Sequence, residues 1–369
     1  MSEKKLKIGI IGCGGIAEQK HFPSLTENSG LCEMVAFCDI IVERAEKAAK
    51  NFGAKGAKVY SDYKDLLKNK DVDVVHVLTP NVSHCPITVD AFEAGKHVMC
   101  EKPMAATTED AEKMIEAWKK SGKMFTIGYQ NRFRPEVQTL HKACKAGELG
   151  EIYYAKAIAL RRRAVPTWGV FPDKAKQGGG PLIDIGTHAL DMTLWMMDNY
   201  APDSVTGSVF FKLGHLPEAT EGNLFGPWDP KTYEVEDSAF GFIKMKNGAS
   251  IMLESSWALN ILESREASTT LCGTKAGAEI RSGMSFPKNE LIMNRGAHGK
   301  LLNESIAPGG EVAYFGGGSS DPGVSEARNW LNAINGKEEL LVKPEQAFIV
   351  TKLLDSIYKS ADGGKEIRF

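Results

Sequence analysis

The chain has 369 residues, of which 43% are hydrophobic and 25% are charged. This length exceeds what one hydrophobic core usually supports, so we expect two domains. The 45 basic and 47 acidic residues leave a net charge of −2, which favours neither a nucleic acid nor a membrane surface as partner. No signal segment precedes the first strand and no apolar window could cross a bilayer, so we expect a cytoplasmic protein.

Seven cysteines are scattered along the chain and no C-x-x-C pair occurs. A disulfide framework or a zinc site would need regular pairs. We therefore expect free thiols in a reducing compartment and no bound metal.

Short apolar runs alternate with helical patterns over the first 130 residues. Strands are predicted at Leu6–Ile11, Met34–Cys38, Val72–Leu78, His97–Met99 and Met124–Ile127. Helices are predicted at Ile16–Glu27 (interrupted near Pro23), Val42–Phe52, Val82–Glu93 and Asp110–Ser121. Near-continuous apolar strands that alternate with helices predict an α/β domain, residues 1–130, with a doubly wound parallel sheet.

The pattern changes after about residue 150, which indicates a second domain over residues 131–369. Strands are predicted at Ile152–Leu160, Ser204–Leu213, Ser238–Lys246 and Ala249–Trp257, and helices at Leu182–Met197 and Glu345–Ser360. Asn247-Gly248 is a two-residue hairpin signal between the last two strands. Long strands with few helices between them favour an antiparallel sheet.

The first strand runs into a glycine-rich loop with the G-x-G-x-x-A pattern of dinucleotide-binding turns. Cofactor contacts from this loop are assigned to Gly12, Gly14, Gly15, Ile16 and Ala17. The second strand ends in Asp39, whose carboxylate can accept hydrogen bonds from ribose hydroxyls. No cation follows Asp39 directly to balance a 2′-phosphate, so we predict NAD rather than NADP as cofactor.

Two further places carry residues suited to catalysis. Lys102 follows a parallel strand, and ligands bind at the carboxyl ends of such strands. Asp184 and His188 lie four residues apart in a predicted helix, so they share one face. Polar groups on an apolar helix are costly to bury without partners. The residues alone also allow a purely structural alternative, in which Asp184 caps the helix and His188 makes a structural hydrogen bond.

Four motifs taken together resemble those of the Gfo/Idh/MocA oxidoreductase family over most of the chain. They are the glycine-rich loop, Thr79-Pro80-Asn81 with His84, Glu101-Lys102-Pro103, and Asp184-x-x-x-His188. The resemblance implies a Rossmann domain followed by an α/β domain with an open, mostly antiparallel sheet. It implies Lys102, Asp184 and His188 as the catalytic trio, and further cofactor contacts from Thr79, Pro80, Asn81, His84, Glu101 and Lys102. It also implies a homodimer or homotetramer.

This trio suits the oxidation of a secondary alcohol. His188 is the natural base, because imidazole titrates near working pH. Lys102 would stabilise the developing charge on the hydroxyl oxygen, and Asp184 would orient the substrate or Lys102. We expect the three side chains to converge in one cleft and the Lys102–Pro103 bond to be cis, which is accessible for X–Pro bonds.

The segment before the catalytic helix carries the clearest substrate signals. Arg163 can donate hydrogen bonds to hydroxyls, and Trp168 can pack on a sugar ring, although a surface loop with a buried tryptophan anchor fits equally well. Tyr129 and Asn131, with Arg132, end the last Rossmann strand and can face the same cleft, as can Asp184 and His188. Tyr233, Glu234 and Glu236 are weaker candidates.

The expected function is hydride transfer between NAD and a ring secondary hydroxyl of a sugar, glycoside or cyclic polyol such as an inositol. The alternative is a glycosidase on the same scaffold that uses NAD transiently. A third possibility is a ligand sensor without catalysis, which ranks last because such a protein would be expected to lose the lysine or the histidine.

Overall fold

The structure is a computed structural model that describes residues 4–306 and 321–369. The chain divides into two compact units, residues 1–133 with 317–348 and residues 134–316 with 349–369. The sequence-based division placed everything after residue 130 in the second domain. The difference arises because a segment late in the chain packs back onto the first unit, where Trp330 and Leu331 bury their side chains in the core. A contact between segments so far apart in sequence leaves no local pattern from which it could be predicted.

The first unit is built on a six-stranded sheet in the order β3-β2-β1-β4-β5-β6, and all of its strand pairs are parallel. The strands are β1 (Leu6–Ile11), β2 (Cys32–Cys38), β3 (Lys58–Tyr60), β4 (Val74–Val77), β5 (His97–Cys100) and β6 (Phe125–Ile127). The predicted doubly wound parallel sheet is therefore confirmed. Only β3 was not predicted from the sequence, because it has three residues and lies largely exposed at the sheet edge.

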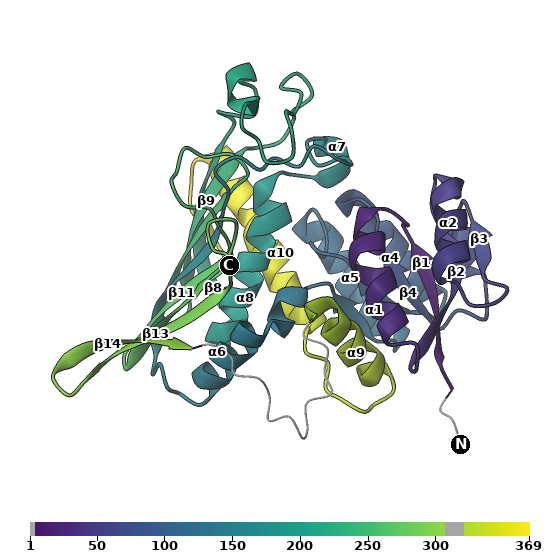
Figure 1. Ribbon diagram of the computed structural model, residues 1–369, viewed down its shortest axis with the longest axis horizontal. Helices are drawn as coiled ribbons and strands as arrows, with labels where there is room; N and C mark the ends of the chain where they lie inside the picture. The colour runs from purple at the N-terminus through teal and green to yellow at the C-terminus, as the bar shows by residue number, and fades with distance from the viewer. Residues whose placement is uncertain (1–3, 307–320) are drawn as a thin grey trace. The chain divides into compact units, whose positions relative to one another are not determined.

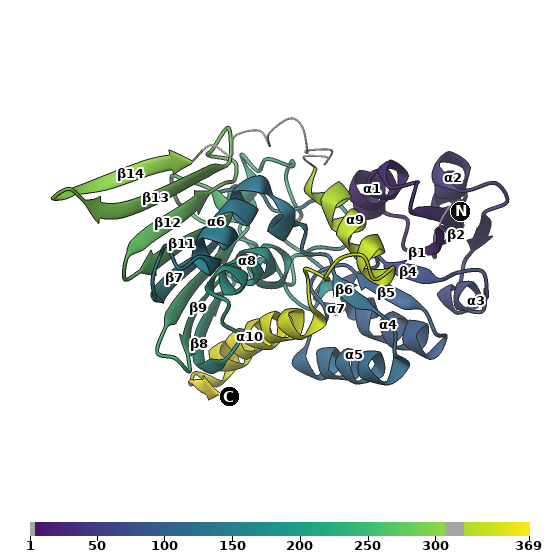
Figure 2. The ribbon, with the colours of Figure 1, turned by 90° about the horizontal axis from the view of Figure 1, so that it is seen from below.

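Helices cover both faces of this sheet. They are α1 (Phe22–Glu27), α2 (Val42–Phe52), α3 (Tyr63–Leu67), α4 (His84–Glu93), α5 (Thr108–Ser121) and α9 (Pro322–Ile334). Figures 1 and 2 show α1, α2 and α9 on one face of the sheet and α4 and α5 on the other. The core on the first face joins Ile8 and Ile10 of β1 to Phe22 of α1.

The helix predicted at Ile16–Glu27 has a widened, π-helical first part over Ala17–His21 before α1 begins. Pro23 explains this geometry. Its ring would clash with the carbonyl four residues earlier in a regular helix, and a wider turn relieves that clash.

The second unit is built on a nine-stranded sheet in the order β14-β13-β12-β11-β7-β10-β9-β8-β15. Its strands are β7 (Ile152–Leu160), β8 (Pro202–Phe210), β9 (Ser238–Met245), β10 (Ser250–Ser256), β11 (Arg265–Gly273), β12 (Ala276–Arg281), β13 (Glu290–Ala297), β14 (Lys300–Ile306) and β15 (Ile367–Arg368). Among the strands of the described residues, only β7 and β10 pair in parallel, so the expectation of a mostly antiparallel sheet is confirmed.

The hairpin between β9 and β10 differs in detail from the two-residue turn that we predicted. The Met245 N–H donates to the Ala249 carbonyl at 2.8 Å, so three residues form the loop. Gly248 takes φ +90° there, a conformation that suits the glycine of a three-residue hairpin.

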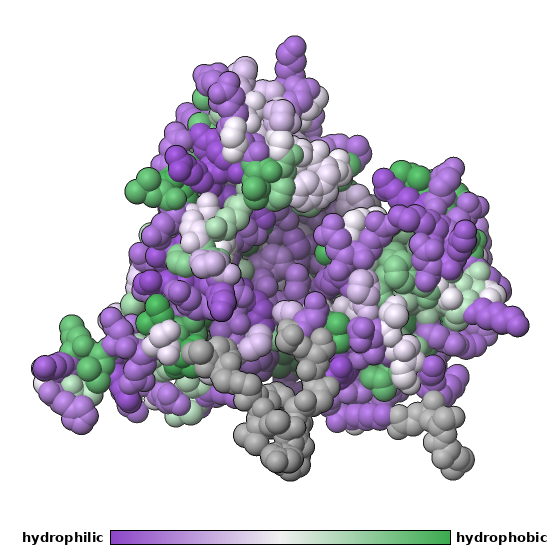
Figure 3. Space-filling view, viewed as in Figure 1, coloured by the Kyte–Doolittle hydropathy of each residue, from purple (hydrophilic) through white to green (hydrophobic). Residues whose placement is uncertain are grey.

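The helices that belong wholly or mainly to this unit include α6 (Pro135–Lys145), α7 (Lys174–Gln177), α8 (Thr187–Met197) and α10 (Pro344–Gly363). Figure 2 shows α6, α8 and α10 along one face of the large sheet. Phe242 lies on the opposite face and is 36% exposed, and Leu301 in β14 is 91% exposed. Figure 3 shows hydrophobic side chains at the end of the β13–β14 hairpin, among hydrophilic ones.

Candidate active site

The glycine-rich loop of the first unit has the backbone that close approach of a ligand requires. Gly12 has φ +96°, and a Cβ there would lie 2.6 Å from the Leu78 carbonyl oxygen, so no other residue fits. A Cβ on Gly14 or Gly15 would meet nothing within 4 Å. Ile16 is 37% exposed, whereas Ala17 is fully buried. The space beside Gly14 and Gly15 is therefore open, as a pyrophosphate would need.

Asp39 follows β2 and lies against this loop. One carboxylate oxygen accepts the Cys13 N–H at 2.8 Å, and the other accepts the Ile41 N–H at 2.8 Å. Each oxygen keeps a further acceptor site, because a carboxylate offers about four in all. Asp39 thus fixes the loop and retains acceptor capacity for ribose hydroxyls.

Thr79, Pro80 and Asn81 follow β4 at the same edge of the sheet. Thr79 Oγ1 is buried and has no hydrogen-bond partner among the described residues. His84 is 1% exposed, and its ring nitrogens lie 2.8 Å from the Pro103 carbonyl oxygen and 2.9 Å from the Thr79 carbonyl oxygen. This histidine therefore ties two loops together, and a direct cofactor contact from its ring is not favoured.

Lys102 lies in the loop after β5, and the Lys102–Pro103 peptide bond is cis, as predicted. The Lys102 backbone N–H donates to Glu101 Oε2 at 3.1 Å. A Cβ on Gly128 would lie 2.8 Å from Glu101 Oε1, so the glycine after β6 leaves room for this carboxylate. The Glu101 side chain thus supports the backbone that carries Lys102.

A buried charged network beneath Lys102 was not predicted from the sequence. Lys20 Nζ lies 2.7 Å from Glu101 Oε1 and 2.7 Å from Glu326 Oε2. Burial alone would raise the pKa of Glu101, but Lys20 and His21 outweigh it and hold that pKa well below its usual range.

Two histidines extend this network. His21 Nε2 lies 2.8 Å from Glu101 Oε1, and its Nδ1 lies 3.0 Å from Nδ1 of His76. Burial lowers the pKa of both rings. Neutral His21 therefore donates through Nε2 to Glu101 and accepts at Nδ1 from His76.

In the second unit, Asp184 and His188 come from one continuous helical segment. A π-helical turn, Leu182–Gly186, carries Asp184 and leads directly into α8, whose first turn carries His188. Such wide turns are frequent at functional sites. The indole N–H of Trp257 donates to Asp184 Oδ2 at 3.1 Å. Trp257 is fully buried and was not predicted as a site residue.

Glu236 anchors the beginning of this segment. Its carboxylate accepts the Gly180 N–H at 2.9 Å, the Leu182 N–H at 3.1 Å and the Tyr358 hydroxyl at 2.7 Å. Burial raises the pKa of Glu236 despite these three donors. The weak sequence signal at Glu236 thus marks a residue that positions the helix.

Aromatic side chains connect the surface of the second unit to Asp184. Trp168 is 51% exposed, so it is not a buried anchor. Its ring makes edge contacts with Phe225 and Phe171, at 4.7 and 5.9 Å between centroids, and Phe171 in turn contacts Trp257 at 6.1 Å.

Two of the three arginines of this segment, Arg161 and Arg163, already have partners in their own unit. Arg163 donates to Asn260 Oδ1 at 2.7 Å and to the Arg162 carbonyl at 2.7 Å. Arg161 forms a two-pronged ion pair with Glu266 at 2.7 and 2.6 Å. Arg163 remains only partly exposed, so its proposed contact with substrate would use the donors that are left.

The residues after β6 that we predicted to face the substrate differ in their exposure. Tyr129 has no exposed surface and Arg132 is fully buried, with its guanidinium bonded to Gln346 at 2.6 Å. Asn131 is partly exposed. Of these residues, Asn131 alone has surface to offer a substrate.

A parallel sheet with an open glycine-rich loop and an acid after the second strand defines a dinucleotide-binding domain. A family model described as "Oxidoreductase family, NAD-binding Rossmann fold" matches residues 6–129. A second, described as "Oxidoreductase family, C-terminal alpha/beta domain", matches residues 141–369. The chain therefore belongs to the Gfo/Idh/MocA oxidoreductase family, and it is an enzyme with an NAD-binding Rossmann domain.

Individual relatives agree with this placement. D-glucoside 3-dehydrogenase of Escherichia coli is 37% identical over 367 residues, which is 100% of this chain and 98% of that protein. Inositol 2-dehydrogenase of Salmonella typhimurium is 33% identical over 207 residues, or 56% and 58% of the two chains. The structure of a levoglucosan dehydrogenase in complex with NADH and levoglucosan matches with TM-score 0.82 and 22% identity over 99% of both chains, which shows the shared fold.

Three structural observations bear on other expectations. All seven cysteines are free thiols. Among residues 4–306 and 321–369, no group of three or more His, Cys, Asp or Glu side chains could hold a metal ion. Within the same ranges, no helix combines the length and apolar character that a membrane span requires.

Proposed function

We propose that this protein is an NAD-dependent dehydrogenase that oxidises a ring secondary hydroxyl of a sugar or glycoside. The observation that carries the proposal is the 37% identity over the whole chain to a D-glucoside 3-dehydrogenase. D-glucosides are therefore the first substrates to test, and cyclic polyols are the second. A cytoplasmic location remains part of the proposal.

The residues of the first unit fit the cofactor. Gly14 and Gly15 leave open space for the pyrophosphate, Asp39 offers acceptors to ribose hydroxyls, and Thr79 Oγ1 is a buried group in need of a partner. When bound, NAD accepts the hydride that leaves the substrate carbon.

The chain itself would handle the proton and the charge. We assign His188 as the base that takes the hydroxyl proton, and Lys102 as the cation that stabilises the oxygen as negative charge develops there. Asp184 would orient the substrate hydroxyl, and its own position is fixed by the Trp257 indole. Exposed Trp168 offers an aromatic face for a sugar ring.

The test is the balance of cofactor during turnover of a panel of D-glucosides and inositols. A dehydrogenase produces one NADH for each oxidised product. A glycosidase that uses NAD transiently releases free sugar and accumulates no NADH. Sugar release without NADH would replace our proposal with that alternative, and binding without turnover would favour a sensor.

We expect the protein to prefer NAD over NADP, because the Asp39 carboxylate would repel a 2′-phosphate and no cation follows it directly in the sequence. Wild type should bind NAD at least about tenfold more tightly than NADP, as expected for one lost hydrogen bond plus charge repulsion. Asp39→Ala should weaken NAD binding and reduce the difference in affinity between NAD and NADP. Calorimetric titrations with both cofactors measure it, and equal wild-type affinities would contradict the assignment.

We also expect the nine-stranded sheet to mediate self-association into a dimer or tetramer. Its helices lie along one face, and the other carries partly exposed aromatic side chains such as Phe210 and Phe242. Sedimentation at micromolar concentration should give a mass of at least twice 40.2 kDa. Phe242→Asp should shift the population toward monomer. A wild-type monomer would rule this expectation out.

A further inference from the structure

A cavity of about 390 Å³ lies at the amino ends of the parallel strands in the first unit. Leu6 begins β1, Asp73 precedes β4, His97 begins β5, and Lys123 shortly precedes β6. These four strands are neighbours in the sheet. The glycine-rich loop and Glu101 follow the carboxyl ends of their strands, so the cavity is at the opposite edge from the cofactor residues.

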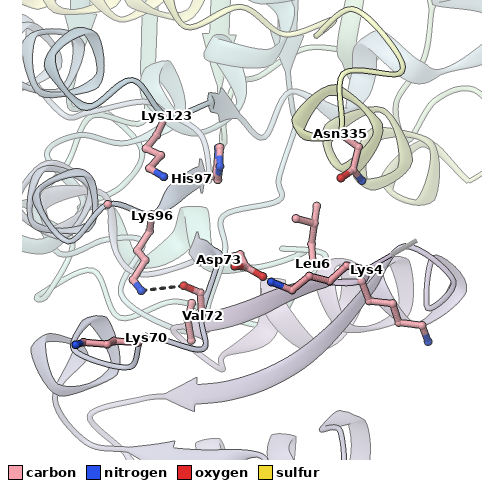
Figure 4. Close-up of a pocket in the computed structure, with 11 residues that line it drawn as sticks. Lys4, Leu6, Lys70, Val72, Asp73, Lys96, His97, Lys123 and Asn335 are labelled. Atoms are coloured by element: carbon pink, nitrogen blue, oxygen red, sulfur yellow. Dashed lines mark hydrogen bonds between the residues drawn. The ribbon is translucent and has the colours of Figure 1, made fainter. Parts of the chain in front are cut away.

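The cavity wall is strongly cationic. Five lysines line it, Lys4, Lys5, Lys70, Lys96 and Lys123, against one acid, Asp73. Five positive charges minus one negative give +4 with His97 neutral, in a chain whose net charge is −2. Apart from the adjacent Lys4 and Lys5, the lysines come from separate parts of the sequence, so no long basic run reveals them. Figure 4 labels four of them, Lys4, Lys70, Lys96 and Lys123, among the side chains that line the cavity.

The most buried of these cations lacks a carboxylate partner. Lys96 is 6% exposed, and its ammonium donates to the carbonyls of Asn69 at 2.9 Å and Val72 at 2.8 Å. No carboxylate oxygen lies within ion-pair distance of Lys96 or Lys123 among the described residues. Burial lowers the pKa of Lys96. An ammonium held by neutral carbonyls leaves a positive potential that an anion would neutralise.

His97 adds a neutral donor to the same wall. Its Nδ1 accepts the Met124 N–H at 3.0 Å, so the ring proton of the neutral form is on Nε2. Figure 4 shows the His97 ring beside Lys123. A bound anion would meet a hydrogen-bond donor here beside the Lys123 side chain.

We propose that this cavity, at the amino edge of the Rossmann sheet, binds a compact, multiply charged anion of the phosphate class. Lysine ammonium groups are effective phosphate partners because each acts as a point charge with three donors. The volume is in the range of small-molecule sites. Its lining includes none of the residues assigned to the cofactor or to catalysis.

The test is a calorimetric titration of the full-length protein with inorganic pyrophosphate at constant ionic strength. Saturating NAD is present, so that the pyrophosphate cannot occupy the cofactor site. We expect saturable binding that is tighter than binding of orthophosphate. Lys123→Ala should weaken it about fivefold, and Lys70→Ala with Lys123→Ala about tenfold or more, as expected for lost close charges. Lys50→Ala removes an exposed lysine of α2 and should have no effect.

A second readout is the NMR signal of the His97 ring. Pyrophosphate should raise the pKa of this ring in the wild type, because an anion favours the imidazolium. Basal turnover should be the same in all the lysine variants. Absence of saturable binding would overturn the proposal, as would equal binding by wild type and the double variant, or a His97 signal that does not respond.

Discussion

His188→Ala and Lys102→Ala should each lower turnover by about two orders of magnitude or more, the usual cost of losing a proton acceptor or an oxyanion partner. His188 is half-buried in the first turn of α8, and Lys102 lies in a loop supported by Glu101. Neither side chain belongs to the glycine-rich loop. NAD affinity should therefore stay close to that of wild type in His188→Ala, which calorimetry with NAD measures beside the rate of NADH formation.

Matched controls separate catalysis from a loss of structure. His215→Ala removes an exposed histidine, and Lys68→Ala removes an exposed lysine paired with Asp65. Both should keep near-wild-type turnover. Added imidazole should restore part of the activity of His188→Ala, which a merely structural histidine would not allow. Near-wild-type turnover of either site variant on the true substrate would refute the assignment.

The first half of the fold was predictable because its signals are local. The apolar runs fixed β1 at Leu6–Ile11, and the amphipathic pattern fixed α2 at Val42–Phe52, with the same bounds as the structure. The strands after Trp257 were not predicted. β13 and β14 are largely exposed, with polar residues on both faces, so they lack the alternation that marks a half-buried strand.

The candidate site also has a part that could be predicted from local signals and a part that could not. The glycine-rich loop, Asp39 and Lys102 are each recognisable from their position after a predicted strand. The supporting contacts join residues far apart in sequence, such as His21 with Glu101, 80 positions apart, and Trp257 with Asp184, 73 positions apart. No single-sequence pattern encodes such pairs. The residues that the motifs mark could therefore be predicted from the sequence. The residues that hold them in position could not.

The buried network below Lys102 carries the largest expected effect on stability. Lys20 is bonded to two carboxylates, Glu101 and Glu326, and all three side chains are at most 10% exposed. Burial alone would lower the pKa of Lys20, but the two carboxylates raise it. Lys20→Met should destabilise the protein by about 3–5 kcal/mol, the usual cost of removing one partner of a buried ion pair. Lys47→Met removes an exposed partner of Glu18 and should cost at most about 1 kcal/mol.

The pH dependence of this loss distinguishes a buried ion pair from lost packing. In wild type the folded-state pKa of Glu101 is below its unfolded value of about 4.3, so its stabilising contribution is present above that pH and is lost as pH falls through the folded pKa. Without Lys20, burial would be opposed by fewer cations and would move the pKa of Glu101 upward. As pH falls, protonation of Glu101 would then remove the unpaired buried charge from Lys20→Met. The variant would therefore lose less stability relative to wild type at low pH. Urea unfolding at pH 7 and pH 4.5 should therefore show a smaller difference between wild type and Lys20→Met at the lower pH, while the Lys47→Met difference stays nearly constant. A Lys20→Met difference that does not change with pH would mean that packing, and not buried charge, is what Lys20 contributes.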